Sequence, residues 1–117
     1  MSNFLFLFRG GDDSFNKLSQ EEKQAHMQVW QTWMGGLQEK GQLIDGEPLS
    51  GEGMVVKNRG EVITNGPFAE GAEMVGGYLI ISADNLDHAV EISKGCPIFD
   101  YEGSTTEVRP IVSMEEH

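Results

Sequence analysis

His26 is the side chain best suited to acid–base chemistry, because an imidazole titrates near neutral pH and can take up or release a proton. Glu39 is the most obvious acidic partner on the same predicted helix, thirteen residues further on. At 1.5 Å per residue this separation is roughly 20 Å, so the two side chains cannot meet within one straight helix. Asp12, Asp13 or a residue of a second subunit would have to assist. The alternative is a partly exposed histidine that flanks the core.

Two glutamates and two arginines form a second set of candidates. Glu70 and Glu73 are close in sequence, and mutual repulsion could raise the pKa of one of them for proton transfer. Either could instead pair with Arg9 or Arg109 and hold the loop in place. The arginines could equally bind an anionic ligand through paired hydrogen bonds. The sequence leaves the structural and the ligand-binding roles open.

Both glutamates belong to the stretch Thr64–Gly77, which reads TNGPFAEGAEMVGG. Its glycines disfavour a helix and weaken a strand, so we expect an ordered loop of defined shape. Phe68 is expected to be buried and to anchor this loop. We expect Pro67, Phe68 and Glu70 to form one wall of a cleft, and the first helix around His26 to form the other.

Trp30 is expected on that second wall, and Trp33 follows it at helical spacing. Such pairs lie in hydrophobic cores more often than in ligand-binding sites, so both roles stay open. Cys96 lies just past a predicted helix end, where the helix dipole disfavours a thiolate, and we reject it as a nucleophile. Three scattered histidines and one cysteine give no zinc-site spacing, so no metal is expected. The glycines form no phosphate-binding pattern between a strand and a helix, and no cofactor is expected.

The composition is that of a single domain spanning residues 1–117. A net charge of −11 argues against nucleic acid and anionic membranes as partners, because both bind clustered Lys and Arg. The single cysteine excludes an internal disulfide and fits a reducing compartment. No apolar segment approaches the ~20 residues of a membrane span, and the FLFLF run is too short for a signal peptide. We therefore expect a cytoplasmic protein.

The strands follow from the apolar pattern. Asn3–Arg9 and Tyr78–Ala83 are apolar on both faces, which is typical of central strands. Gln42–Leu49 is predicted as an edge or irregular strand. Thr106–Ser113 is predicted at an edge because Pro110 lacks the N–H that a central strand donates.

Two helices and a hairpin complete the pattern. The first helix is predicted to begin at Ser19, where Glu22 completes a capping box, and to end near Gly41. Gly35-Gly36 within it indicates close backbone packing or a break. The residues expected to face the sheet are Met27, Trp30, Met34 and Leu37. Asn58-Arg59-Gly60 is predicted as a hairpin loop.

The second helix is predicted to begin at Asp84 as its cap and to end at Gly95, with Leu86, Ala89 and Val90 inward. The order of elements predicts an α+β fold of the ferredoxin-like, split βαβ type, an antiparallel sheet with two helices on one face. The sheet's other apolar face then requires cover, so we expect a face-to-face homodimer.

Several motifs resemble those of the YCII-related proteins. Asn65-Gly66-Pro67-Phe68-Ala69-Glu70, with Glu73 and Gly76-Gly77-Tyr78 after it, is similar to their DGPF signature. The resemblance also includes Ser19-Gln20-Glu21-Glu22, Gly41-Gln42-Leu43 and Glu107-Val108-Arg109-Pro110. It implies a ferredoxin-like subunit that pairs into a dimeric α/β barrel with a cleft lined by the motif loop. The family's role is mostly unassigned, although some relatives use a His and an Asp, and one is a dehydrochlorinase of a chlorinated aromatic.

Two functions stay open on the sequence. The first is a small-molecule enzyme, of lyase, isomerase or hydrolase type, with His26 and Glu70 as catalytic residues. The second is a non-catalytic ligand-binding or accessory module in which the NGPF loop is architectural. The residues expected to contact the ligand are Arg9, Trp30, Pro67, Phe68, Glu73 and Arg109.

Overall fold

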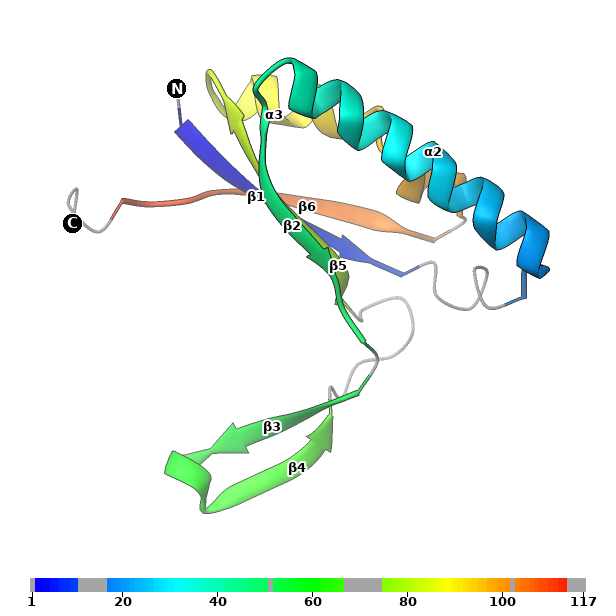
Figure 1. Cartoon of the computed structure of the whole chain (residues 1–117). Coiled ribbons are helices and arrows are strands. Elements are labelled where there is room, and N and C mark those ends of the chain that lie inside the picture. The colour runs from blue at the N-terminus through cyan, green and yellow to red at the C-terminus, as the bar shows by residue number, and fades with distance from the viewer. Residues whose placement is uncertain (1, 11–16, 51, 67–74, 102, 114–117) are drawn as a thin grey trace.

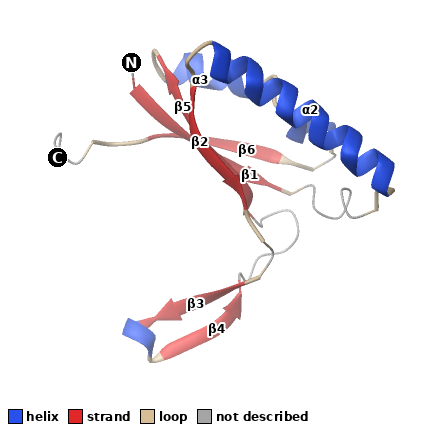
Figure 2. Ribbon diagram, viewed as in Figure 1, coloured by secondary structure: helices blue, strands red, loops and turns tan. Residues whose placement is uncertain are grey.

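The described part of the chain folds into a four-stranded sheet, two helices and a separate two-stranded hairpin (Figures 1 and 2). The computed structural model describes residues 2–10, 17–50, 52–66, 75–101 and 103–113. Its elements are β1 (Ser2–Arg9), α2 (Gln20–Glu39), β2 (Leu43–Pro48), β3 (Gly53–Lys57), the 3-10 turn η1 (Asn58–Gly60), β4 (Val62–Gly66), β5 (Val75–Ala83), α3 (Leu86–Ser93), the 3-10 turn η2 (Pro97–Asp100) and β6 (Thr105–Pro110).

The main sheet has the order β2-β5-β1-β6, with every neighbouring pair antiparallel. The two strands predicted to be central, β1 and β5, are central, and the Pro110-bearing strand β6 lies at an edge. The strand predicted from Gln42 to Leu49 is β2, at the other edge. This is the split βαβ, ferredoxin-like arrangement that the order of elements predicted.

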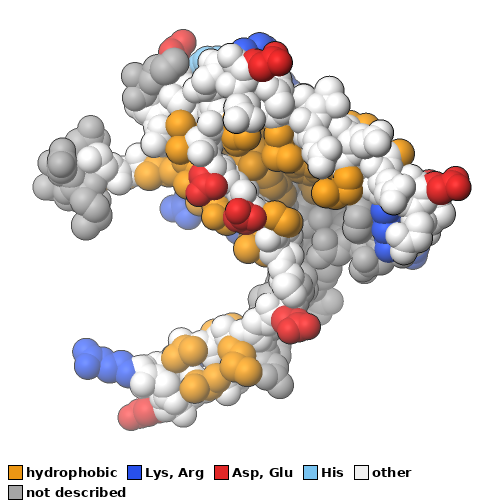
Figure 3. Space-filling model, in the orientation of Figure 1, with side chains coloured by type: hydrophobic (Ala, Val, Ile, Leu, Met, Phe, Trp, Pro, Cys, Tyr) orange, Lys and Arg blue, Asp and Glu red, His pale blue; other side chains and the backbone are white. Residues whose placement is uncertain are grey.

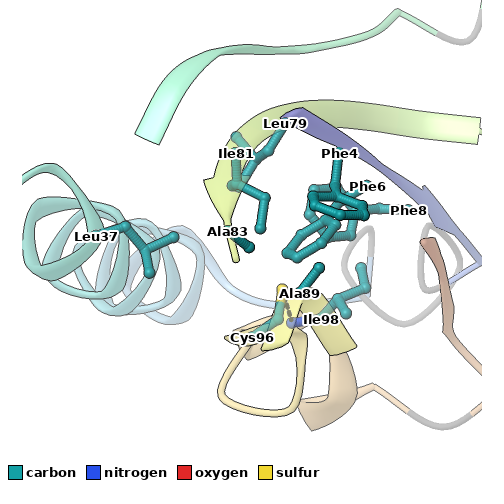
Figure 4. Close-up of a cluster of buried hydrophobic side chains, with 10 residues drawn as sticks. All are labelled: Phe4, Phe6, Phe8, Leu37, Leu79, Ile81, Ala83, Ala89, Cys96 and Ile98. Atoms are coloured by element: carbon teal, nitrogen blue, oxygen red, sulfur yellow. Dashed lines mark hydrogen bonds between the residues drawn. The ribbon is translucent and has the colours of Figure 1, made fainter. Parts of the chain in front are cut away.

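Both helices cover the same face of the sheet (Figure 1). Every second side chain of β1 points to this face, and the phenyl rings of Phe4, Phe6 and Phe8 are all buried there. Figure 4 shows these rings gathered beside β5 and the segment that carries Ala89 and Ile98. The rest of the buried apolar cluster consists of Leu37, Leu79, Ile81, Ala83, Ala89, Cys96 and Ile98.

The opposite face, which we name the open face, has no described helix over it (Figure 1). Its centre is apolar, because Leu5 lies opposite Ile80 and Leu7 lies opposite Tyr78 across β1 and β5. All four side chains are only half-buried. The apolar pattern on both sides of the central strands is therefore real, and one side of it lacks cover within the described chain.

Helix α2 begins where the sequence predicted, because Ser19 and Glu22 form both hydrogen bonds of the capping box. Neither expectation for Gly35-Gly36 was right. The helix is continuous through them, and a methyl group added at either would meet no atom of the described neighbouring elements within 4 Å. The prediction that Met27 faces the sheet was also wrong, since its side chain is 50% exposed. Counting back four residues from Trp30 brings His26, rather than Met27, onto the inward stripe.

The start of α3 also differs from the prediction. Its cap is Asn85, whose side chain accepts from the backbone N–H of His88, while the Asp84 N–H donates to His88 Nδ1. Ala89 is fully buried as expected. Leu86 and Val90 are exposed, and Ser93 takes the inward position one turn after Ala89.

The predicted hairpin is confirmed as β3 and β4. Asn58, Arg59 and Gly60 all adopt positive φ, which places the chain reversal at the predicted residues. The hairpin projects away from the sheet and helices (Figure 1). The radius of gyration is accordingly 15.9 Å, whereas a compact chain of this length has about 13 Å.

Replacing Phe6 by alanine should lower the free energy of unfolding by about 3–5 kcal/mol, because its ring is fully buried and a cavity would remain. Urea denaturation followed by circular dichroism measures this change. Val29→Ala on the exposed side of α2 is the control and should stay within about 0.5 kcal/mol of the wild type. Equal loss in both variants would contradict the assignment of the core.

Candidate functional site

A hydrogen bond between two candidate residues is the centre of the site. His26 and Trp30 lie one turn apart on α2, and Trp30 Nε1–H donates to His26 Nε2 at 2.6 Å. Because Nε2 accepts, the neutral imidazole carries its own proton on Nδ1. His26 therefore cannot take up a proton at Nε2 without losing this bond.

Aromatic rings surround this pair. The Tyr101 ring centre lies 4.6 Å from that of His26, and the Phe8 ring meets Trp30 edge-on at 5.3 Å. Trp33 contacts Trp30 at 5.8 Å, one turn further along α2. We name His26, Trp30 and Trp33 the aromatic row. It is held against β1 by Phe8 and against the segment after η2 by Tyr101.

The pKa of His26 is lowered, chiefly because its partial burial penalises the charged imidazolium. The nearby Asp100 carboxylate opposes this shift but does not cancel it. The same two features raise the pKa of Tyr101, since both burial and Asp100 disfavour a phenolate. At neutral pH the cluster therefore offers an uncharged imidazole and an uncharged phenol.

Thr106 brings a buried hydroxyl to the same side of the sheet. It lies opposite Phe8 in the pairing of β1 with β6, and its side chain points to the helix-covered face. Its Oγ1 is buried and has no hydrogen-bond partner within the described chain. A buried hydroxyl without a partner costs free energy that a bound water or ligand atom would recover.

The two candidate arginines lie on the other side of the sheet. Arg9 Nη2 is 3.3 Å from one oxygen of Glu107, and Arg109 Nε is 3.8 Å from the other. Since Glu107 lies opposite Leu7, this cluster is on the open face. The sheet thus separates Arg9 and Arg109 from His26 and Trp30, and the sequence did not reveal that division.

The remaining predicted site residues lie outside the described residues. These are Pro67, Phe68, Glu70 and Glu73 of the stretch Thr64–Gly77, together with Asp12 and Asp13, which were proposed to assist His26. The described parts of Thr64–Gly77 end β4 and begin β5, so the stretch does lead into the central strand as expected.

A groove of about 470 Å³ lies between α2 and α3 and was not predicted. Trp33, at the end of the aromatic row, lines it with Leu37 and Ile92. Gly36 also lines it, and an added methyl group there would meet open space. The positions of Tyr101 and Thr106 had no sequence signal, because distant segments bring these residues to this side of the sheet only in the folded chain.

A sequence model of the YCII-related domain matches residues 4–115, nearly the whole chain. The protein belongs to the YCII-related family. A solved structure with the same fold is 5-chloro-2-hydroxyhydroquinone dehydrochlorinase (TftG) from Burkholderia phenoliruptrix AC1100, in complex with 2,5-dihydroxybenzoquinone. The TM-score is 0.56 at 14% identity, with 98% of each chain covered, so the likeness concerns the fold alone. No curated protein matches the sequence.

Among the described residues, no group of His, Cys, Asp and Glu side chains could hold a metal ion. Cys96 is buried, and that burial raises its pKa to about 12, so its thiol is not a nucleophile near neutral pH. Within the same residues, no helix is both long and apolar enough to cross a bilayer.

The pKa of His26 should lie below the ordinary value of about 6.5, and it should rise in Trp30→Phe. This variant keeps an aromatic ring but removes the indole N–H that donates to His26 Nε2. A proton can then bind at Nε2 without the loss of a hydrogen bond. A pH titration of the imidazole signals by NMR measures both values. A wild-type pKa above the ordinary value would contradict the role assigned to the Trp30 bond.

The same shift sets a pH dependence of stability. The unfolded chain binds the His26 proton more readily, so the free energy of unfolding should fall as the pH drops below about 6.5 and be unaffected by His26 above it. His26→Gln should show a smaller fall over that acidic range than the wild type. Urea denaturation across a pH series provides the comparison, and parallel curves for the two proteins would refute this contribution.

Proposed function

We propose that this YCII-related protein is a homodimer that binds a small, flat organic molecule against the aromatic row. The observation that carries the proposal is the bond between Trp30 and His26, which fixes a neutral imidazole between aromatic rings. Flat rings stack on Trp and Tyr faces, and an uncharged N–H donor suits a ketone, quinone or phenol oxygen. The partnerless Thr106 hydroxyl offers a further hydrogen bond on the same face of the sheet.

The net charge of the chain restricts the class of ligand further. A net charge of −11 repels highly anionic ligands such as nucleotides. The two arginines, which could have bound an anion, are on the open face and pair with Glu107. A small ligand without phosphate groups therefore fits best. The groove beside Trp33, at one end of the aromatic row, has room for a molecule of this size, although His26 and Trp30 do not line it.

Acid–base catalysis on such a ligand is the second candidate. It is supported by the shared fold with TftG, a dehydrochlorinase crystallised with a dihydroxybenzoquinone. In this version His26 polarises a substrate oxygen as a neutral donor, because its Nε2 is occupied, and another group removes the proton. Glu70 of the NGPF loop is the residue proposed for that step.

The homodimer is supported by the open face. Leu5, Leu7, Tyr78 and Ile80 form an apolar centre there that a second copy would cover. The two edges of this face carry opposite charges. Arg109 lies on β6 and Arg9 on the adjacent strand β1, whereas Asp45 and Glu47 lie on β2 at the other edge. A twofold axis parallel to the strands lays β2 of one subunit over β6 of the other. It sets Arg109 against Asp45 of the second copy, because the two lie at the same level of the sheet. We therefore propose a face-to-face dimer, a dimeric α/β barrel, about this axis.

Titrating the protein with 2,5-dihydroxybenzoquinone should reveal saturable binding by isothermal calorimetry, and Trp30→Phe should weaken it by about tenfold, or 1.4 kcal/mol. The control is Val29→Ala, which alters the exposed side of α2 and should bind as the wild type does. Chloride release from 5-chloro-2-hydroxyhydroquinone, lost in His26→Ala, would favour the catalytic candidate. Binding that Trp30→Phe leaves unchanged would refute the site.

Reversing the charge of Arg109 in Arg109→Glu should raise the dissociation constant of the dimer by about tenfold. Combining it with Asp45→Arg should restore the wild-type value, because Arg109 and Asp45 lie at the same level of the sheet and then exchange signs across the twofold axis. Sedimentation equilibrium measures all four proteins of this cycle. If the double variant is as weak as the two single effects combined, the two edges do not meet as proposed.

A further inference from the structure

The β3–β4 hairpin has three exposed apolar side chains on one face. Met54 and Val56 of β3 share this face with Ile63 of β4, because Val56 lies opposite Ile63 in the register. Their exposed fractions are 69%, 59% and 56%. We name these three side chains the hairpin patch. Lys57 lies on the other face of the ribbon, next to Val56 in sequence.

An exposed patch of this kind is unfavourable for an isolated ribbon. A two-stranded hairpin is at best marginally stable in water and normally needs a further surface to pack against. The described helices do not provide it, because the hairpin projects away from them (Figure 1). Burying the patch against another apolar surface would remove it from water and hold the ribbon in place.

The shape of the chain shows where that surface would come from. Figure 3 shows a hollow between the hairpin and the rest of the chain, with hydrophobic side chains on both sides. The open face of the sheet, with Leu7 and Tyr78 near its centre, is turned toward the hairpin. A second copy that packs on the open face must enter this hollow, so it comes within reach of the hairpin.

The charges also favour a second copy. Residues 52–66 contain two acidic and two basic side chains, Glu52, Lys57, Arg59 and Glu61, and are neutral together. The rest of the chain therefore carries the whole net charge of −11. A hairpin without net charge can approach this acidic surface of a second copy without the net repulsion that two negatively charged bodies experience.

We propose that the hairpin is an arm whose patch packs on the second copy of the chain seated in the hollow. This inference rests on the proposed homodimer and adds a second contact region to it. Each subunit then contributes two surfaces, its open face and its arm, and by twofold symmetry each arm is used once. A dimer without the arm contact would leave Val56 as exposed as it is in one chain.

Thiol labelling of Val56→Cys and Lys57→Cys tests this directly, because the native Cys96 is buried and the two new thiols lie on opposite faces of one ribbon. Each variant is labelled with an aromatic disulfide reagent at concentrations well below and well above its own dimer dissociation constant, measured by sedimentation equilibrium. For Val56→Cys, labelling should slow by about tenfold at the higher concentration, as the dimer fills. For Lys57→Cys, it should proceed at one rate throughout.

The other outcomes each decide the question. If both cysteines react rapidly in the assembled dimer, the dimer stands and the arm contact is refuted. If Val56→Cys reacts slowly at every concentration, its own chain covers the patch, and the second copy is not the occupant. If the wild type stays monomeric at all concentrations, the homodimer and the arm both fail.

Discussion

Cover for both faces of β1 and β5 is the constraint on which the rest of the structure depends. The same two strands present Phe4, Phe6 and Phe8 to the helices and Leu5 and Leu7 to the open face. Two helices can bury only the first set. A second subunit that covers Leu5 and Leu7 would account for three features together: the sheet order, the charged edges and the projecting hairpin.

The helix-covered face determines the chemistry that the chain can support. The hydrogen bond from Trp30 occupies the nitrogen of His26 that would otherwise act as a base, and partial burial lowers its pKa further. The residue that looked most like a general base in the sequence is therefore better suited to donate a hydrogen bond. That change of role moves the proposal from proton abstraction by His26 toward recognition of a flat, oxygen-bearing ligand.

Much of the fold could be predicted because its signals are local. The capping box at Ser19, the hairpin loop ending at Gly60 and the two-sided pattern of the central strands all depend on neighbouring residues. The site was less predictable because its contacts join distant segments. Nothing near His26 in sequence indicates Tyr101, and alternation along single strands could not show that Arg9 and Trp30 lie on opposite sides of the sheet.

The central claim is that the open face is covered by a second copy of the chain. Small-angle X-ray scattering tests it most directly, because the forward scattering gives the mass of the particle in solution without any substitution. The account predicts a mass twice the 12.9 kDa of one chain. A particle that keeps the mass of one chain as its concentration is raised would contradict it.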